Sequence, residues 1–183
     1  SQSIIEAPVL FAFIIAMMIQ VELQASINMG LSLELLAAGL ALALGCIGPC
    51  IGQAIFSFAS CTAIGLNKDI YNKMFPFALL NQAIIETPVI FCMLFSLITL
   101  LWGPDAPPLV DGYKHLIAAC TIGVGAIGAS IGIGVVASRS CYPIALDPNS
   151  YGSVARTSFL AAVFIESSVI YALIIALLLI MGT

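Results

Sequence analysis

The strongest constraint on this chain is a carboxylate placed inside a long apolar run. Between Met74 and Leu101 the only Asp, Glu, Lys, Arg or His is Glu86, near the middle of the run. A run of this length can cross a bilayer core, which needs about 20 apolar helical residues. A charge at that depth costs about 3 kcal/mol even on lenient insertion scales. Because no Lys or Arg lies in the interior of an apolar run, we expect Glu86 to be neutralised by a proton or a small bound cation.

The acid-bearing segment occurs three times at an interval of 80 residues, around Glu6, Glu86 and Glu166. The same interval pairs glycines and a tyrosine of the intervening segments: Gly45 with Gly125, Gly48 with Gly128, Gly52 with Gly132, and Tyr71 with Tyr151. This regularity is too extensive for chance similarity between apolar helices. It predicts two full helical hairpins preceded by a fragment of another.

The composition agrees with a membrane protein, because 62% of the residues are hydrophobic, only 8% are charged and the mean hydropathy is +1.18. We predict an all-α membrane protein of tandem transmembrane hairpins, with four full helices and an N-terminal helix fragment. The predicted units are a half-helix or short membrane helix over 1–22, hairpin 1 over 33–101 and hairpin 2 over 113–183. Residues 1–22 lack the basic start of a signal peptide and correspond by the repeat to the second half of a longer helix. An independent short helix with Glu6 near an interface is the alternative.

The first helix of each predicted hairpin is rich in small residues. Gly48 and Gly52 lie four residues apart, on one helix face, which lets another backbone approach closely.

Loop charges predict the orientation in the membrane. The loops within the two hairpins hold four of the five basic residues, Lys68, Lys73, Arg139 and Arg156. The opposite ends hold mainly acids, and His115 is expected there as an interface residue. By the positive-inside rule the hairpin loops face the cytoplasm of a multi-pass protein in the cell membrane. The five Lys and Arg residues form no basic patch, so no nucleic acid partner is expected.

The position of the hairpin loop predicts which residue of the first helix lies opposite Glu86. A hairpin folded at about residue 69 places Gln53 opposite Glu86, and Thr87 follows in sequence. Amide, carboxylate and hydroxyl oxygens around one pocket suit a hard alkali cation, whereas a proton site needs only the carboxyl and one acceptor. The alternative is a plain hydrogen bond that joins the two helices.

Hairpins with a Gly-rich first helix, a polar loop and a mid-membrane Glu on the second helix resemble the c-subunit proteolipids of rotary ATP synthases and ATPases. The resemblance covers nearly all of residues 33–183, and the doubled hairpin is similar to the V-type form and to fused subunits of some sodium-driven F-type rings. It implies a rotor ring with first helices inside and second helices outside. The implied subunit carries Na⁺ or H⁺ without catalysis or a tightly bound cofactor. The implied partners are other c subunits, a stator a subunit with an arginine, central-stalk subunits and lipid.

The resemblance extends to the sodium-type motif, in which Pro-x-x-x-Gln on the inner helix accompanies Glu followed by Ser or Thr on the outer one. Pro49, Gln53 and the pair Glu86-Thr87 match it in full. The resemblance also implies that the backbone carbonyl of Ile84 joins the ligand shell of a Na⁺ held by Glu86, Gln53 and Thr87.

The last repeat departs from this motif. Ala129 and Ile133 replace the Pro and the Gln, although Glu166 and Ser167 remain. We therefore expect Glu166 to bind sodium poorly or to exchange only protons. The tyrosine that often follows the family's Glu by five residues is present as Tyr171, whereas the equivalent after Glu86 is phenylalanine. In this family a site is shared across neighbouring hairpins, so Ser167 and Thr87 can serve adjacent sites.

Two other departures concern the ends of the repeat. Glu6 is followed by Ala7 and has no preceding inner helix, so it is the weakest of the three acids as an ion site. The family's Arg-Gln-Pro loop signature is missing, which implies that central-stalk docking uses other polar contacts or other subunits of a mixed ring.

Two rival functions remain at the level of sequence. A small four-helix proton-coupled multidrug exporter would carry its acid on the first helix of each unit, surrounded by aromatic residues. A ring subunit that has lost ion transport stays possible for hairpin 2 only, because Ile133 replaces the Gln there.

Overall fold

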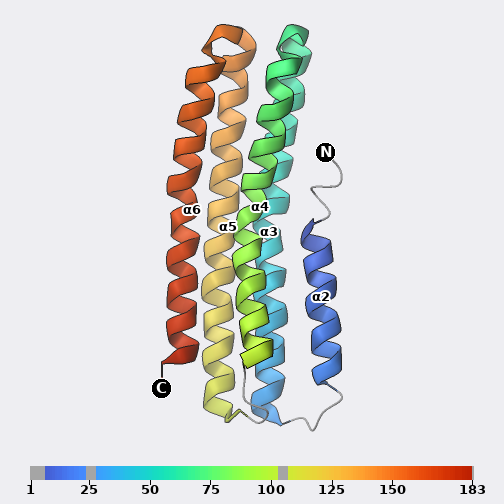
Figure 1. Cartoon of the computed structure of the whole chain (residues 1–183), viewed down its shortest axis with the longest axis vertical. Helices are drawn as coiled ribbons and strands as arrows, with labels where there is room; N and C mark the ends of the chain where they lie inside the picture. The colour runs from blue at the N-terminus through green and yellow to red at the C-terminus, as the bar shows by residue number, and fades with distance from the viewer. Residues whose placement is uncertain (1–6, 24–27, 103–106, 183) are drawn as a thin grey trace.

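The computed structural model describes residues 7–23, 28–102 and 107–182, so Glu6 lies outside the described residues. The described part is all α-helical apart from short turns, as predicted, and contains no strand. The helices are α2 (Ala7–Glu22), α3 (Met29–Leu66), α4 (Tyr71–Trp102), α5 (Leu109–Leu146) and α6 (Tyr151–Met181) (Figure 1). The short 3₁₀ turns η1 (Lys68–Ile70) and η2 (Pro148–Ser150) close two antiparallel pairs, hairpin 1 (α3 and α4) and hairpin 2 (α5 and α6).

The four long helices are apolar enough and long enough to cross a membrane, whereas α2 has only 16 residues. A helix of 38 residues, the length of α3 and α5, spans about 57 Å at 1.5 Å per residue. A bilayer core is about 30 Å thick, so both helices extend well beyond it. α3 and α5 begin four residues before the predicted boundaries at 33 and 113, because the helices are not limited to the part of the chain that crosses the core.

The two hairpin loops use the same turn at positions 80 residues apart. Oδ1 of Asn67 accepts a hydrogen bond from the backbone N–H of Asp69 at 3.1 Å, and Asp147 accepts one from Asn149 at 3.0 Å. Such side-chain-to-backbone bonds replace helical ones and favour a reversal. The end of the molecule that carries η1 and η2 is called the loop end below, and the opposite end is the open end.

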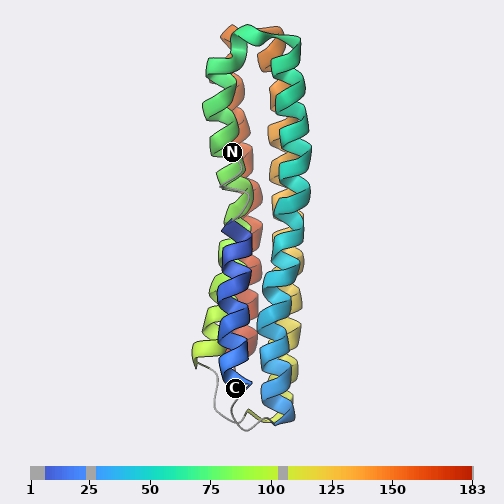
Figure 2. The same cartoon turned by 90° about the vertical axis from the view of Figure 1, so that its right-hand side faces the viewer.

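The helices form two layers (Figure 2), with α3 and α5 in one and α2, α4 and α6 in the other. Glycines allow α3 and α5 to approach closely. A Cβ atom at Gly48 would lie 2.7 Å from Cα of Ile127, and one at Gly134 would lie 2.5 Å from the carbonyl oxygen of Gly52. The small residues expected at a close helix contact therefore lie at the contact between the first helices of the two hairpins.

The second helices pack over this contact, and a cluster of buried residues joins the two hairpins near the loop end. Phe77 of α4 lies between two rings of α6, with centroid distances of 6.3 Å to Tyr151 and 5.7 Å to Phe159. Two polar contacts join the loops themselves: the Lys73 ammonium donates to the carbonyl of Pro148 at 2.8 Å, and the Asn67 amide donates to that of Ala145 at 3.1 Å.

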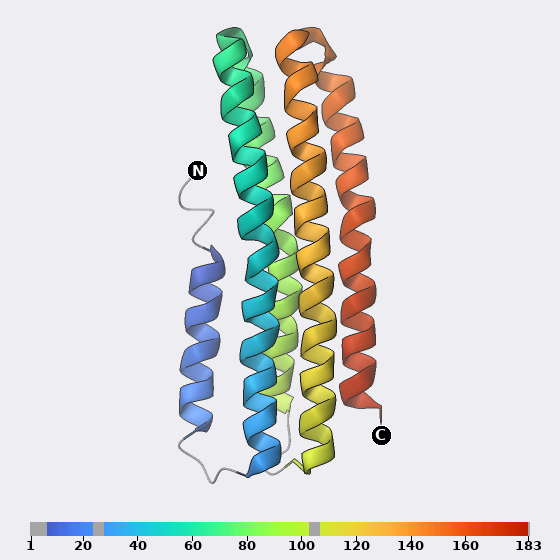
Figure 3. The same cartoon turned by 180° about the vertical axis from the view of Figure 1, so that it is seen from behind.

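Helix α2 packs against hairpin 1 as α4 packs against hairpin 2. Ile15 of α2 and Phe95 of α4 are 80 residues apart and are 2% and 0% exposed, whereas Ile175 of α6, the third member of the series, is 51% exposed. α2 thus corresponds to the second half of α4 or α6, and it lies beside only the open-end half of hairpin 1 (Figures 1 and 3).

Candidate ion-binding site

The acid that dominates the sequence lies inside the helix pair. Glu86 is on the middle part of α4 and only 9% exposed, and Gln53 on α3 is 5% exposed. The Gln53 amide Nε2 donates a hydrogen bond to Oε1 of Glu86 at 2.6 Å. A buried polar side chain on each helix of hairpin 1 therefore finds its partner on the other helix, which is the condition for burying both groups.

The two neighbours expected beside Glu86 contact each other. The Thr87 hydroxyl donates to the backbone carbonyl of Ile84 at 2.7 Å. The Thr87 oxygen donates in this bond, so its own lone pairs remain free. One of the two lone pairs of the Ile84 carbonyl oxygen also remains free. Both oxygens can therefore still accept a proton donor or contact a cation.

A second polar contact lies one helical turn toward the loop end. Gln82 precedes Glu86 by four residues on α4, and its amide Nε2 donates to the hydroxyl of Ser57 at 3.3 Å. Ser57 in turn follows Gln53 by four residues on α3. Residues four apart share a helix face, so the two pairs form successive steps along the same helix contact. The sequence analysis missed this second pair, although the common spacing on both helices is visible there.

Hairpin 2 lacks the corresponding contact. Ile133 occupies the position of Gln53 and is fully buried. Glu166 is half-buried on α6, and among the described residues no side chain forms a hydrogen bond with it. Ser167 donates to the carbonyl of Phe164 at 2.7 Å, as Thr87 does to Ile84. Tyr171, one turn further on, is 65% exposed. The structure thus brings Gln53 and Glu86 together but leaves Glu166 without an equivalent partner in the described chain.

The sequence analysis also missed a buried pair at the open end. Nε2 of His115 on α5 lies 3.1 Å from Oε1 of Glu34 on α3, and both side chains are buried. The other ring nitrogen, Nδ1, is 2.8 Å from the carbonyl of Asp111. A carbonyl only accepts, so Nδ1 carries a hydrogen, and Nε2 is the ring nitrogen that faces the Glu34 carboxyl. His115 is therefore a paired contact between the hairpins and not the simple interface residue that its place at a helix end suggests.

Comparison with known proteins identifies the repeat. The sequence model of the ATP synthase c-subunit family matches the chain twice, over residues 36–99 and 116–179. The chain belongs to the ATP synthase c-subunit family. Each match falls on one hairpin, so this member of the family contains the family unit in duplicate.

Individual members of the ATP synthase c-subunit family agree with this assignment. The chain is 40% identical over 76 residues to the ATP synthase c subunit of Natranaerobius thermophilus, which covers 39% of this chain and 88% of that protein. It is 39% identical over 72 residues to the ATP synthase c subunit of Nostoc sp., which covers 39% of this chain and 89% of the relative. It is 36% identical over 70 residues to the chloroplastic ATP synthase c subunit of Emiliania huxleyi, with 38% and 85% covered. One hairpin of this chain thus corresponds to nearly a whole relative.

Membership in the ATP synthase c-subunit family assigns the chain the role of a rotor-ring subunit in a membrane complex. A subunit of this kind carries ions and is not itself a catalyst. Together with four helices that can span a bilayer, membership makes the chain a multi-pass membrane protein. The exporter alternative has no comparable support.

Proposed function

We propose that this rotor subunit carries Na⁺ on Glu86, with Gln53 and Thr87 as further ligands. The observation that supports this proposal is the direct contact between Gln53 and Glu86 across hairpin 1. A carboxyl that only exchanged protons would need one acceptor, and an apolar residue could occupy the place of Gln53. An amide at this position supplies a neutral oxygen once it rotates by half a turn, because Oε1 and Nε2 then exchange places.

The proposed ligand set consists of oxygens, as a hard cation prefers. Glu86 supplies a carboxylate, Gln53 its amide oxygen and Thr87 its hydroxyl, and the carbonyl of Ile84 adds a fourth. Since family sites are shared between neighbouring hairpins, the hydroxyls of Ser167 and Thr87 can also serve the sites of adjacent hairpins.

Ion carriage follows from the cost of a bare charge in lipid. An occupied Glu86 is neutral overall and can face the hydrocarbon, whereas an ionised one cannot do so without a large penalty. We infer that the stator a subunit supplies a half-channel through which the ion enters, and a second one through which it leaves. An arginine of that subunit stabilises the bare carboxylate between these two events, so the ring turns in the direction that carries occupied sites through lipid.

We propose that Glu166 exchanges protons only. The buried Ile133 removes the amide oxygen that Na⁺ needs, and Ala129 removes the proline of the motif. Tyr171 is the residue that would lock the protonated Glu166, by donating its phenolic hydrogen to the carboxyl group. One chain would then carry one sodium site and one proton site.

The proposed orientation places the loop end in the cytoplasm, because it carries Lys68, Lys73, Arg139 and Arg156. Central-stalk subunits would dock there through polar groups of the two loops. The direct partners in the membrane are further c subunits, lipid and the stator a subunit.

Carbodiimide labelling of the glutamates, located by mass spectrometry with and without Na⁺ across pH, tests the sodium proposal. The reagent modifies protonated carboxyl groups, so bound Na⁺ should protect Glu86 above neutral pH and leave Glu166 reactive. Gln53→Ile imitates hairpin 2 and should remove most of the protection. Labelling of Glu86 that is indifferent to Na⁺ would make it a proton site, and protection that survives in Gln53→Ile would exclude Gln53 as a ligand.

A further inference from the structure

Glu34 and His115, together called the open-end pair below, lie where the two hairpins meet at the open end. Glu34 is on α3 and His115 on α5, the first helices of the two hairpins. Glu34 is 2% exposed and His115 is 7% exposed. The proposed ion carriers, Glu86 and Glu166, are on the second helices, so ion carriage does not explain the open-end pair.

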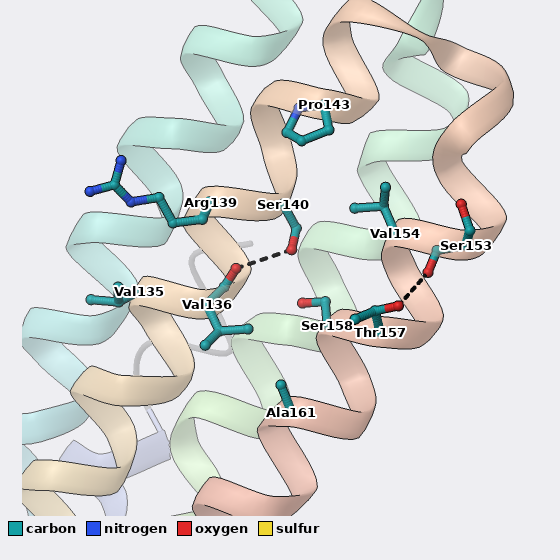
Figure 4. A pocket seen from close by; sticks show the side chains of 10 residues that line it. All are labelled: Val135, Val136, Arg139, Ser140, Pro143, Ser153, Val154, Thr157, Ser158 and Ala161. Atoms are coloured by element: carbon teal, nitrogen blue, oxygen red, sulfur yellow. Dashed lines mark hydrogen bonds between the residues drawn. The ribbon is translucent and has the colours of Figure 1, made fainter.

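The open-end pair joins the two hairpins, unlike the polar groups at the opposite end of hairpin 2. A groove of about 480 Å³ lies there between α5 and α6 (Figure 4). The two hydrogen bonds drawn in Figure 4 run from Ser140 to the carbonyl of Val136 and from Thr157 to that of Ser153. Each of these bonds stays within one helix, whereas the open-end pair crosses from one hairpin to the other.

The depth of the open-end pair places it outside the hydrocarbon of a membrane. Glu34 precedes Gln53 by 19 positions, which is about 28 Å along a helix at 1.5 Å per residue. Half of a bilayer core is only about 15 Å thick. With Gln53 and Glu86 at the middle of the membrane, the open-end pair lies beyond the core. Protons from water at the open end can therefore reach it without crossing lipid.

Both nitrogens of the His115 ring face hydrogen-bond acceptors. Nδ1 is 2.8 Å from the carbonyl oxygen of Asp111, and Nε2 is 3.1 Å from Oε1 of Glu34. Since Nδ1 carries a hydrogen, the contact at Nε2 is attractive only with a second hydrogen between the nitrogen and the carboxyl oxygen. The other neutral form of the ring, with hydrogen on Nε2 alone, would turn a bare Nδ1 toward the Asp111 carbonyl. One added proton therefore satisfies both contacts, and no rearrangement of a neutral ring does so.

The helices are in backbone contact beside the open-end pair. A Cβ atom at Gly112 would lie 2.9 Å from the carbonyl oxygen of Gly30 and 2.9 Å from Cβ of Leu33. These residues lie within about one turn of Glu34 and His115. A carboxylate left bare in this contact would stay buried rather than become hydrated, which is costly.

A hydroxyl group lies at the level of the open-end pair. Ser96 of α4 donates to the carbonyl of Ala38 on α3, and Thr99 and Glu34 each lie about one turn further toward the open end. Thr99 is 2% exposed. Within the described residues, neither its hydroxyl nor Oε2 of Glu34 has a hydrogen-bond partner. Thr99 is therefore available as a donor to the second oxygen of the carboxyl group.

The other charges near the open-end pair largely cancel. Asp111 and Lys114 of α5 form an ion pair at 2.9 Å, and both side chains are 36% exposed. Among the described residues, α2 adds only the exposed Glu22, and the open-end halves of α4 and α6 add no Asp, Glu, Lys, Arg or His. With one added proton the open-end pair is neutral as a whole. Without it, a buried negative charge remains that no neighbouring cation offsets.

We propose that Glu34 and His115 together bind one proton, at a site separate from the ion-carrying glutamates, and that this proton holds the hairpins together at the open end. There is one such site per chain, because the repeat equivalents of Glu34 and His115 are Lys114 and Leu35. When rising pH removes the proton, the bare carboxylate weakens the contact between α3 and α5. The proposal does not depend on which ion Glu86 carries.

Nuclear magnetic resonance of the imidazole tests proton binding, because His115 is the only histidine of the chain. Rings labelled with ¹⁵N-histidine in lipid nanodiscs are titrated, and the shifts report the hydrogen on each ring nitrogen. Nδ1 should keep its hydrogen at every pH. The titration midpoint should lie roughly one pH unit or more above that of Glu34→Gln, whose amide favours the neutral ring.

Glu22→Gln is the matched control for the imidazole titration. It removes an exposed acid at the same end of the molecule and should leave the midpoint of His115 unchanged. Equal midpoints in the unmodified protein and in Glu34→Gln would overturn the proposal. A ring with hydrogen on Nε2 alone would overturn it as well.

Amide hydrogen exchange tests the effect on the hairpin contact and needs no variant for its main result. Above the midpoint of the unmodified rings, amides around Glu34 and His115 should exchange roughly tenfold faster than base catalysis alone predicts. Amides of the loop end are the internal reference. In the double variant Glu34→Leu with His115→Leu the extra exchange should disappear, because no proton is left to lose. Extra exchange that persists in the double variant, or none in the unmodified rings, would exclude this role of the proton while leaving the rotor function standing.

Discussion

At the scale of single residues, three polar side chains of α4 are paired with α3 across hairpin 1. Glu86 binds Gln53, Gln82 binds Ser57, and the Ser96 hydroxyl of α4 donates to the carbonyl of Ala38 on α3 at 2.7 Å. Each of these contacts joins α4 to α3. Polar groups in lipid are costly unless they are paired, so these contacts hold the hairpin in register, and one of them lies at the proposed ion site.

The Glu34–His115 pair is predicted to stabilise the contact between α3 and α5. His115→Leu would leave the Glu34 carboxyl buried without a partner and should lower the stability by about 3–5 kcal/mol. Glu34→Gln keeps a donor for Nε2 of His115 and should cost less, about 1 kcal/mol. Thermal unfolding in detergent measures both. Equal losses in the two variants would show that His115 does not stabilise the Glu34 carboxyl.

The double substitution of Glu34 and His115 by Leu is the control for this pair. Leu35 already occupies the position equivalent to His115 in the repeat, so an apolar side chain is compatible with this kind of site. Removing both partners should therefore cost less than His115→Leu alone. Additive losses would mean that the two side chains do not interact.

At the scale of helices, the close approach of α3 and α5 depends on glycine. Gly134→Ala would place a Cβ atom about as close as 2.5 Å to the backbone of Gly52, and backbone cannot yield as a side chain can. We expect a loss of about 1–3 kcal/mol in the free energy of unfolding. Gly152→Ala in the first turn of α6 has no described atom near its Cβ and should gain up to about 1 kcal/mol from helix propensity. Denaturation of both variants in mixed detergent micelles compares them, and equal stability would deny the close contact.

The helices and the Glu86 pair could be predicted because they follow local rules. Apolar runs mark the spans, the 80-residue interval marks the repeat, and counting through a short loop places Gln53 opposite Glu86. The starts of α3 and α5 could not be located in the same way, because the length needed to cross the core sets only a minimum for each helix. The Glu34–His115 pair was missed for another reason: its members lie 81 residues apart, and their repeat equivalents are Lys114 and Leu35, so the repeat gives no hint of it.

At the scale of the whole molecule, the two hairpins of the duplicated unit differ in their polar side chains and in their contacts. Hairpin 1 carries the amide–carboxyl pair and large aromatic side chains at its contact with hairpin 2. Hairpin 2 carries a lone acid and a groove. Because of these differences, the two hairpins of the chain are not interchangeable. In a ring of such chains, each hairpin 1 would lie between two copies of hairpin 2. The proposed sodium and proton sites would therefore alternate.

This alternation predicts a sodium stoichiometry for the chain. Equilibrium binding of radioactive Na⁺ to purified rings should give one ion per chain, because Ile133 disables the second site. Ile133→Gln restores the amide opposite Glu166 and should raise the stoichiometry toward two, with Na⁺ now protecting Glu166 from carbodiimide. Ile133→Leu is the matched control for a change at this buried position and should leave one ion per chain. Two ions per chain in the unmodified protein would mean that Glu166 binds Na⁺ without an amide, and the separate roles of the two hairpins would have to be abandoned.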